Sequence, residues 1–480
     1  KFARIPVFDP STPQEAYDMT KEAIKLSKLF ETIVMLRPVM RVCHAREICE
    51  VTQNHEFTPQ SANFQKNATR WAAVPRATRY PQGVEQLKRV VELENYNYEN
   101  YIKPKLKELK NRKILAITSG VADGYVKECV GELNLDVDIL KIDMPYPLPK
   151  QKIEKLFKNY EKVIIFEETY PCIEEQLSSP KIHGKLTDDV HKIDEFTKEK
   201  VLNTFIKLSV FKEKNRYDNR PYEEKLPPRQ PNLCPGCPHR NLFYAIKKTF
   251  RDKSSIFSSD IGCYTLGLNQ KAIDSYLCMG ASISMASGYS IAHPEKITVA
   301  TLGDSTFLHS GIAPLVNAVA QNHRFILIIM DNSTTAMTGR QTTPEVLNPS
   351  KINIKKIVEG CGVECIEYVY TPNIKETIAF TKKLKKTYEE STSPIVAVFK
   401  EFCILDKTRS TEFLPKIYSQ VNQDKCTTCN VCMTEYSCPA FFYNENNKVD
   451  IDPFLCVGCS ACIDGLCPTN AFEEVKRGES

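Results

Sequence analysis

The sequence predicts an α/β protein with doubly wound parallel sheets, followed by a small cysteine-rich α+β module. Two observations lead to this fold class. Short apolar strands alternate with helices over residues 113–210 and again over 234–412, as in parallel α/β domains. Eight of the 19 cysteines then fall within residues 426–467. In a long chain, clustered cysteines indicate metal binding more often than a disulfide scaffold.

Composition narrows the class of protein. The 480 residues suggest about three domains. The net charge of +5 is small for this length and the basic residues are scattered, which argues against nucleic acid as a partner. No apolar run approaches the roughly 18 residues that a membrane span needs, and no apolar signal core follows Lys1. We therefore expect a cytoplasmic protein with no membrane partner.

The first 112 residues predict the end of one domain and a connection. Residues 11–15 combine a capping residue with a proline in the first turn and so predict a helix start, and a strand is expected at 33–36. These few elements cannot bury a core alone, so we expect more of this domain before Lys1. Residues 56–112 are predicted to be a polar linker that ends in a helix near 97–110.

Two α/β domains and a terminal module are expected after this linker. The smaller domain, 113–210, has strands at 113–118, 137–142 and 163–166. Four prolines predict a second linker at 211–233. The larger domain, 234–412, has strands at 297–302, 325–330 and 395–399, and the cysteine-rich module follows at 413–480.

Two cysteine runs in the last module have the spacing of iron–sulfur ligands. In each run three cysteines are separated by two residues, and a fourth precedes a proline. Such triplets ligate three irons of one [4Fe–4S] cube, and the remote cysteine closes the cluster of the other run. Zinc sites usually use two separated pairs instead. The two predicted ligand sets are Cys426, Cys429, Cys432 and Cys467, and Cys456, Cys459, Cys462 and Cys438.

Polar residues end two neighbouring strands of the larger domain. Gly303-Asp304-Ser305 follows the strand at 297–302, and Asp331-Asn332 follows the one at 325–330. Open parallel sheets bind ligands at the carboxyl ends of their strands. Mg²⁺ prefers oxygen ligands, which Asp304, Asn332 and the Thr334 carbonyl could supply. Gly303 would let the backbone approach a diphosphate. A lone Gly-Asp is more often a turn, but two strand tips of one βαβ unit favour a metal–diphosphate site.

These motifs resemble a known family. Gly303-Asp304 followed by Asp331-Asn332 resembles the thiamine-diphosphate fold of the 2-oxoacid:ferredoxin oxidoreductases. The motifs at 234–240, 260–263 and 278–281 look like the cofactor domain of the indolepyruvate:ferredoxin oxidoreductase alpha subunits. Residues 113–176 are similar to the middle, transketolase-C-terminal-like domain of those subunits, and the paired cysteine runs fit their two-cluster ferredoxin-like end. The resemblance makes residues 1–55 the end of a pyrimidine-binding domain and puts the activating glutamate before Lys1, so no catalytic residue is assigned.

The resemblance also implies site residues. Three of the ligands of a proximal [4Fe–4S] cluster would be Cys234, Cys237 and Cys263, and Mg²⁺ would be held by Asp304, Asn332 and Thr334. Ser305 departs from the glycine common after Gly-Asp in this family. The implied cofactor contacts are Ile261, Gly262, Cys263, Tyr264, Gly280, Ala281, Gly303, Ser305, Thr306, Ala336 and Met337.

Three cysteines compete for the fourth position of the proximal cluster. Cys361 and Cys365 precede a strand, at the edge of the sheet opposite the cofactor. Cys403 follows the strand at 395–399, and parallel strands put that end beside Asp304. We therefore predict Cys403, which is also where the family has its last cluster cysteine. His239 stands beside the cluster motif, but a general-acid role is not favoured.

The implied activity is oxidative decarboxylation of aryl pyruvates such as indolepyruvate to acyl-CoA and CO₂, with reduction of ferredoxin. It requires thiamine diphosphate, Mg²⁺, three [4Fe–4S] clusters and coenzyme A as cosubstrate. The family implies a smaller beta subunit, an external ferredoxin and a higher hetero-oligomer as partners. Three alternatives stay open: another 2-oxo acid, a non-oxidative thiamine decarboxylase, which would leave the cysteines unused, and a polyferredoxin-type electron-transfer subunit.

Overall fold

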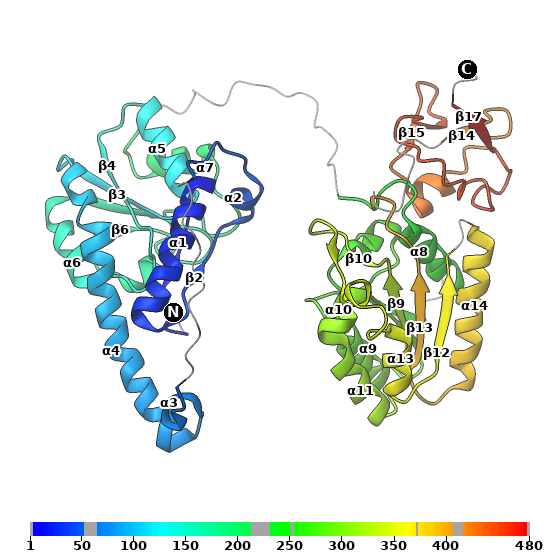
Figure 1. Cartoon of the computed structure of the whole chain (residues 1–480). Coiled ribbons are helices and arrows are strands. Elements are labelled where there is room, and N and C mark those ends of the chain that lie inside the picture. The colour runs from blue at the N-terminus through cyan, green and yellow to red at the C-terminus, as the bar shows by residue number, and fades with distance from the viewer. Residues whose placement is uncertain are drawn as a thin grey trace. The chain divides into compact units, whose positions relative to one another are not determined.

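The computed structural model describes residues 3–51, 65–212, 231–250, 254–370, 373–406 and 416–477. The chain divides into two compact units, 1–225 and 226–480 (Figure 1). Most of the expected linker at 211–233 lies outside the described residues, as do the first residues of the linker expected at 56–112. None of the helices in the described ranges combines the length and apolarity that crossing a bilayer requires.

The first unit is built on a four-stranded parallel sheet. Its strands lie in the order β4 (Val137–Lys141), β3 (Ile114–Thr118), β5 (Lys162–Phe166) and β6 (Ile182–His183). One face packs on α5 (Ala122–Glu132) and α7 (Lys198–Lys207), and the other packs on α6 (Lys150–Glu154) and neighbouring turns. The three strands expected from the sequence are confirmed to within one residue at either end.

The N-terminal segment adds a small parallel pair to this unit. Strands β1 (Val7–Phe8) and β2 (Met35–Leu36) are joined by α1 (Pro13–Phe30), and the short α2 (Met40–His44) follows. The Thr12 side chain accepts a hydrogen bond from the Glu15 backbone N–H at 3.2 Å, so the predicted capped helix start is confirmed. The second strand is shorter than the expected 33–36.

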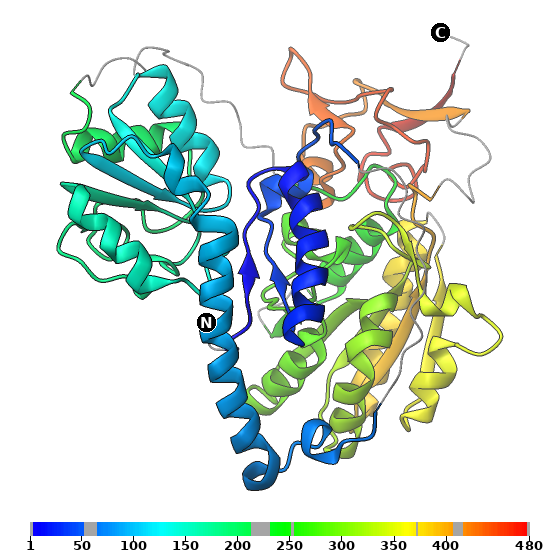
Figure 2. The ribbon, with the colours of Figure 1, turned by 60° about the vertical axis from the view of Figure 1, so that its left-hand side comes forward.

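The expected polar connection contains the longest helical stretch of the unit, and the helix predicted near 97–110 is misplaced. After α3 (Ala68–Trp71) and a turn at Pro75–Arg79, α4 spans Tyr80–Asn97 and continues through Tyr98–Ile102 to a 3₁₀ turn at Lys105–Glu108. The amino end of α4 extends beyond the sheet (Figure 2). Leu93 packs with Phe8 and Leu26, and Ile102 joins the core of the sheet. These distant contacts stabilise a helix that the local polar composition did not predict.

The second unit contains a five-stranded parallel sheet with helices on both faces, the doubly wound architecture that the sequence predicts. The strand order is β12 (Cys365–Val369), β13 (Ile395–Lys400), β9 (Ile326–Asp331), β8 (Ile297–Gly303) and β7 (Ser255–Ser258). One face carries α8 (Pro238–Thr249) and α14 (Ile374–Glu390). The other carries α9 (Ala281–Ala292), α11 (Ile312–Ala320) and α13 (Ile354–Gly360).

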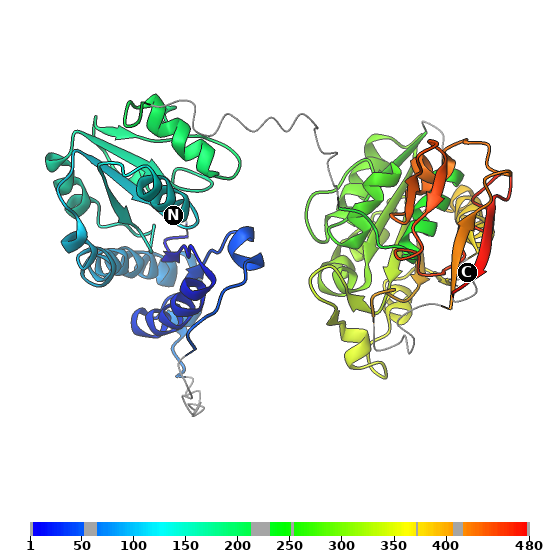
Figure 3. The same ribbon diagram turned by 90° about the horizontal axis from the view of Figure 1, so that it is seen from above.

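The C-terminal segment of this unit is small and irregular. It has two antiparallel pairs, β14 (Ile417–Val421) with β17 (Phe472–Lys476) and β15 (Phe441–Tyr443) with β16 (Val449–Ile451), and one helical turn at Cys432–Tyr436. Its core packs against Tyr244 of α8 and Ile374 of α14. Figure 3 shows these orange and red segments beside the parallel-sheet domain of the same unit.

Candidate cofactor site and cysteine sets

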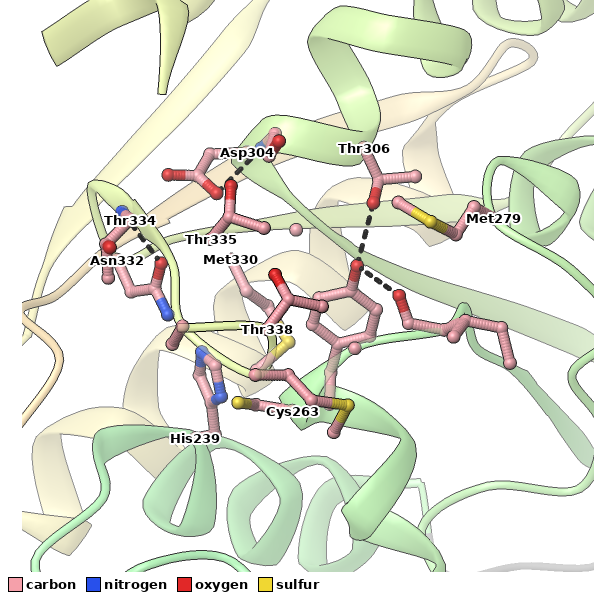
Figure 4. Close-up of a pocket in the computed structure, with 17 residues that line it drawn as sticks. His239, Cys263, Met279, Asp304, Thr306, Met330, Asn332, Thr334, Thr335 and Thr338 are labelled. Atoms are coloured by element: carbon pink, nitrogen blue, oxygen red, sulfur yellow. Dashed lines mark hydrogen bonds between the residues drawn. The ribbon is translucent and has the colours of Figure 1, made fainter. Parts of the chain in front are cut away.

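A cavity with an empty volume of about 550 Å³ opens at the carboxyl ends of β8 and β9. In Figure 4, Asp304 and Thr306 lie on its upper side, and His239 and Cys263 lie on its lower side. Twelve residues that the sequence analysis assigned to the cofactor or metal line it: Ile261, Gly262, Cys263, Tyr264, Gly303, Asp304, Ser305, Thr306, Asn332, Thr334, Ala336 and Met337.

Asp304 has an uncompensated carboxylate. It begins the short α10 (Asp304–Thr306) directly after β8 and is 3% exposed. Its Oδ1 accepts a hydrogen bond from the Ser305 N–H at 2.7 Å, but its buried Oδ2 has no hydrogen-bond partner within the described ranges. Burial, together with the neighbouring carboxylate of Asp331, raises the pKa of Asp304 to about 8. A bound cation would compensate both charges.

Asn332 and Thr334 are held next to this carboxylate by a tight turn after β9. Ser333 has a φ of 59°, and the Thr334 N–H donates to the Asn332 Oδ1 at 3.2 Å. Both residues are buried. Thr334 belongs to β10 (Thr334–Thr335), which pairs with β11 (Gln341–Thr342). The turn thus supplies oxygen atoms of the kind that Mg²⁺ prefers.

Tyr264 explains two glycines of the cavity wall. Its hydroxyl donates to the Ile261 carbonyl at 3.0 Å and lies 2.9 Å from the Thr306 Oγ1. A Cβ at Gly262 would lie 2.5 Å from the tyrosine ring, and one at Gly303 would lie 2.6 Å from it. Glycine at 303 therefore makes room for an aromatic ring, whereas the reason expected from the sequence was the approach of a diphosphate.

Gly280 and Ala281 do not line the cavity. Gly280 precedes α9 with a φ of +88°, and its N–H donates to both carboxylate oxygens of Asp260 at 2.9 Å. The Ser282 N–H donates to the same carboxylate at 3.3 Å. The wholly buried Asp260 thus occupies the amino end of α9, and the neighbouring Met279 contributes to the cavity instead.

His239 is a cavity residue to which the sequence analysis gave no role. It lies in the first turn of α8, is 2% exposed, and forms an ion pair with the buried Glu401, which follows β13. Burial lowers the pKa of His239, but Glu401 and Cys237 more than offset this, so the net shift is upward. The histidine was visible beside the cysteine motif, but nothing in the sequence pairs it with a glutamate more than 160 residues away. Four further lining residues were also missed: Met279, Met330, Thr335 and Thr338.

The four cysteines assigned to the proximal cluster share one neighbourhood. Cys234 and Cys237 precede α8, Cys263 follows Gly262, and Cys403 follows β13. Burial raises the pKa of the Cys234, Cys263 and Cys403 thiols, and other members of the set raise each of them further. Cys365 instead pairs with Val396 near the opposite end of β13 and lies in the core.

The set does not have the geometry of a single-ion site. Within the ranges that the structure describes, no three His, Cys, Asp or Glu side chains are placed to hold one metal ion. A cubane cluster instead spreads its four thiolates over four irons, so it needs a wider set.

The C-terminal cysteines also fall into two groups. A second cavity, with an empty volume of about 360 Å³, is lined by Cys438, Cys456, Cys459 and Cys462. Burial raises the pKa of Cys459 to about 11 and that of Cys462 to about 12, and the other thiols of this group add to both shifts. Cys438, which follows the first run along the chain, therefore lies with the three cysteines of the second run.

The remaining four cysteines adjoin one another along two neighbouring segments. Burial raises the pKa of Cys432 to about 11, with contributions from Cys429 and Cys426. The segment after Cys467 lies beside the first run, because the Asn422 N–H donates to the Ala471 carbonyl at 2.7 Å and the Thr469 hydroxyl donates to the Lys425 carbonyl at 2.8 Å.

Comparison with known proteins defines the class. Residues 260–398 match the family described as the C-terminal TPP-binding domain of thiamine pyrophosphate enzymes. This match covers the strands and loops that build the cavity. This part of the chain is therefore similar to a thiamine pyrophosphate-binding domain.

Curated relatives then define the family. Indolepyruvate oxidoreductase subunit IorA from Pyrococcus horikoshii is 36% identical over 100% of this chain and 79% of its own length. The subunits of the same name from Thermococcus kodakarensis and Archaeoglobus fulgidus are 36% and 32% identical, over 100% and 99% of this chain and 79% and 78% of their own lengths. The chain belongs to the IorA family of indolepyruvate oxidoreductase subunits, so the family resemblance read from the motifs is confirmed.

Proposed function

We propose that this chain is the catalytic alpha subunit of a 2-oxoacid:ferredoxin oxidoreductase that acts on aryl pyruvates, indolepyruvate among them. The bond between the carbonyl and carboxylate carbons of the substrate breaks and CO₂ leaves. A carbon–sulfur bond to coenzyme A forms, one proton is released, and two electrons pass to ferredoxin. The observation that carries the proposal is the cavity with an uncompensated Asp304 carboxylate beside a set of four cysteines. The name of the relatives supports the substrate.

The cavity fits a diphosphate–magnesium group. Asp304, Asn332 and the backbone at Thr334 would hold the metal ion, because their oxygens adjoin and one buried carboxylate oxygen lacks a partner in the described ranges. Residues Ile261–Tyr264, Ala336 and Met337 would contact the rest of the cofactor. When bound, thiamine diphosphate supplies a carbanion nucleophile and an electron sink. The buried Met330 contributes an apolar side chain to the cavity wall.

The three cysteine sets fit three [4Fe–4S] clusters. Cys234, Cys237, Cys263 and Cys403 would hold the first, and Cys263 also belongs to the cavity wall, so this cluster would border the reacting cofactor. The two sets of the C-terminal, ferredoxin-like segment would hold the others. Clusters of this type would carry single electrons, which transfer to an external ferredoxin requires.

The setting of the subunit follows from the same proposal. The relatives are named as subunits, which supports a hetero-oligomer with a smaller beta subunit. The proposed activity adds ferredoxin and coenzyme A as exchanging partners, and the proposed location is the cytoplasm. The functional divisions would be 1–55, 113–210, 234–412 and 413–480, joined by linkers at 56–112 and 211–233.

The cluster assignment is tested by iron analysis of the anaerobically purified full chain. We expect about 12 iron atoms per chain, and Cys403→Ala should lose one cube by electron paramagnetic resonance. The matched variant Cys365→Ala, at the other end of the same sheet, should keep three. If Cys365→Ala loses a cube and Cys403→Ala does not, the assignment of Cys403 is wrong.

The activity is tested on the same protein assembled with its smaller subunit. Reduction of a viologen dye is followed with indolepyruvate, phenylpyruvate and pyruvate, and we expect kcat/KM to be at least about tenfold higher for the aryl substrates. Protein that holds iron but no thiamine diphosphate would identify an electron carrier instead. Protein that holds thiamine diphosphate but no iron would identify a decarboxylase.

A further inference from the structure

Arg240 is a buried cation that joins two cysteine-bearing loops. It lies in α8 and is 1% exposed. Its Nη1 donates to the carbonyls of Tyr436 and Ser437 at 2.9 and 2.5 Å, directly before Cys438. Its Nη2 donates to the carbonyl of Leu233, directly before Cys234. One guanidinium therefore holds the loop of the proximal set and the loop of a C-terminal set.

Among the described residues, no carboxylate forms an ion pair or a hydrogen bond with this guanidinium. Its hydrogen-bond partners within the described residues are backbone carbonyls and the side-chain amide of Asn232 at 3.5 Å. An isolated charge in a protein interior is costly unless an opposite charge compensates it. The sulfurs of Cys234 and Cys438 are the candidates, because each residue directly follows a carbonyl that the guanidinium binds, and both would be thiolates as cluster ligands.

The two loops also touch each other directly. Gly236, between Cys234 and Cys237, has a φ of +72°, and a Cβ at this position would lie 2.3 Å from the Val457 side chain and 3.4 Å from the Cβ of Cys459.

We propose that Arg240 is a positioning residue whose fixed positive charge is shared by the cluster of Cys234, Cys237, Cys263 and Cys403 and the cluster of Cys438, Cys456, Cys459 and Cys462, and that it raises the reduction potential of both. The proposal rests on the proposed function, which places clusters in these sets. A cation favours the reduced, more negative state of a cluster, and net charge and hydrogen bonds to the cluster site are principal determinants of its potential. None of Cys426, Cys429, Cys432 and Cys467 directly follows a carbonyl that Arg240 binds, so we expect the third cluster not to share this charge.

The test is a redox titration of the full chain followed by electron paramagnetic resonance. In Arg240→Gln we expect the reduction equilibrium of two clusters to fall about tenfold, which is about 59 mV for one electron, while the third is unchanged. Arg240→Lys keeps the charge and should retain more than half of the effect. The control Arg324→Gln removes a cation that contacts Tyr388, away from all three sets, and should change no potential.

A second variant keeps the proposal testable if Arg240→Gln does not assemble. Asn232 is exposed, and Asn232→Asp would pair the guanidinium with a carboxylate of nearly the same size, at the loss of the hydrogen bond that the Asn232 amide donates to the Ser437 carbonyl. It should lower the same two equilibria about threefold. Three intact clusters with wild-type potentials in Arg240→Gln, or in Asn232→Asp where the first variant fails, would overturn the role of Arg240. Wild-type protein without iron would instead overturn the proposed function.

Discussion

The two parallel sheets of the chain differ in what fills the carboxyl ends of their strands. Open parallel sheets bind ligands there, most often where the strand order reverses. In the first unit the order reverses between β3 and β5, and the crevice is occupied by the chain's own side chains. In the second unit the carboxyl ends of strands β8 and β9 border the open cavity that contains Asp304.

Side chains of the N-terminal segment occupy the carboxyl edge of the first sheet. The Ser119 hydroxyl donates to the Asp9 carboxylate at 2.6 Å, and the Arg37 guanidinium donates to the same oxygen at 2.9 Å. Arg37 also donates to the Glu168 carbonyl at 2.6 Å. A Cβ at Gly120 would lie 2.8 Å from the Asp9 carboxylate, which shows how closely this segment packs. The topology of a sheet alone therefore does not identify a ligand site. A site is left only where the chain does not itself supply partners to the polar groups at the carboxyl ends of the strands.

The largest effect expected from this comparison is at Asp304. Asp304→Ala should weaken thiamine diphosphate and Mg²⁺ binding by more than about a hundredfold, because it removes the metal carboxylate. It should not lower the unfolding free energy of the metal-free chain, since it removes a buried carboxylate that is repelled by Asp331. Isothermal titration calorimetry and urea unfolding measure the two quantities. Unchanged cofactor affinity would show that thiamine diphosphate does not bind at the carboxyl edge of the second sheet.

The second expected effect is a pH dependence of the unfolding free energy that arises at the first sheet. Burial raises the pKa of Glu167, at the end of β5, from 4.5 to about 7, although its carboxylate accepts hydrogen bonds from the Ile173 and Glu174 N–H groups. The folded state therefore binds more protons than the unfolded state. This contribution to stability is fully present below about pH 4.5 and is lost as the pH rises to about 7, in total about 3 kcal/mol.

Glu167→Gln should remove that dependence while leaving cofactor binding intact. Urea unfolding of the full chain at several pH values between 5 and 8 would measure the difference between variant and wild type. Parallel curves for the two proteins would show that Glu167 titrates normally.

A smaller effect is expected at the closed edge itself. Arg37→Met should lower the unfolding free energy by about 2 kcal/mol, because the buried Asp9 loses its counter-charge; the value is reduced because Arg37 is partly exposed. Thiamine diphosphate affinity, measured by calorimetry, should not change. Normal stability in this variant would mean that the closure of the first sheet does not depend on this ion pair.

The sequence by itself determined the family, the parallel α/β fold, the capped start of α1 and most residues of the cavity wall. These features depend on local patterns: apolar runs bounded by turns, a capping residue before a proline, and polar residues at strand ends. Each can be recognised within a few residues of the chain, because strand alternation and helix capping are short-range effects.

Only the tertiary structure decided which polar groups are paired. The ion pair of His239 with Glu401, the Asp260 carboxylate at the start of α9, the tyrosine ring that requires glycine at 303, and the Arg240 bridge all join residues far apart in the chain. The helix α4 and its continuation through Tyr98–Ile102 likewise depend on burial of Leu93 and Ile102 in two different cores. Burial and pairing depend on long-range contacts, and these contacts determine which carboxylate has a partner and which is left free to bind a cation.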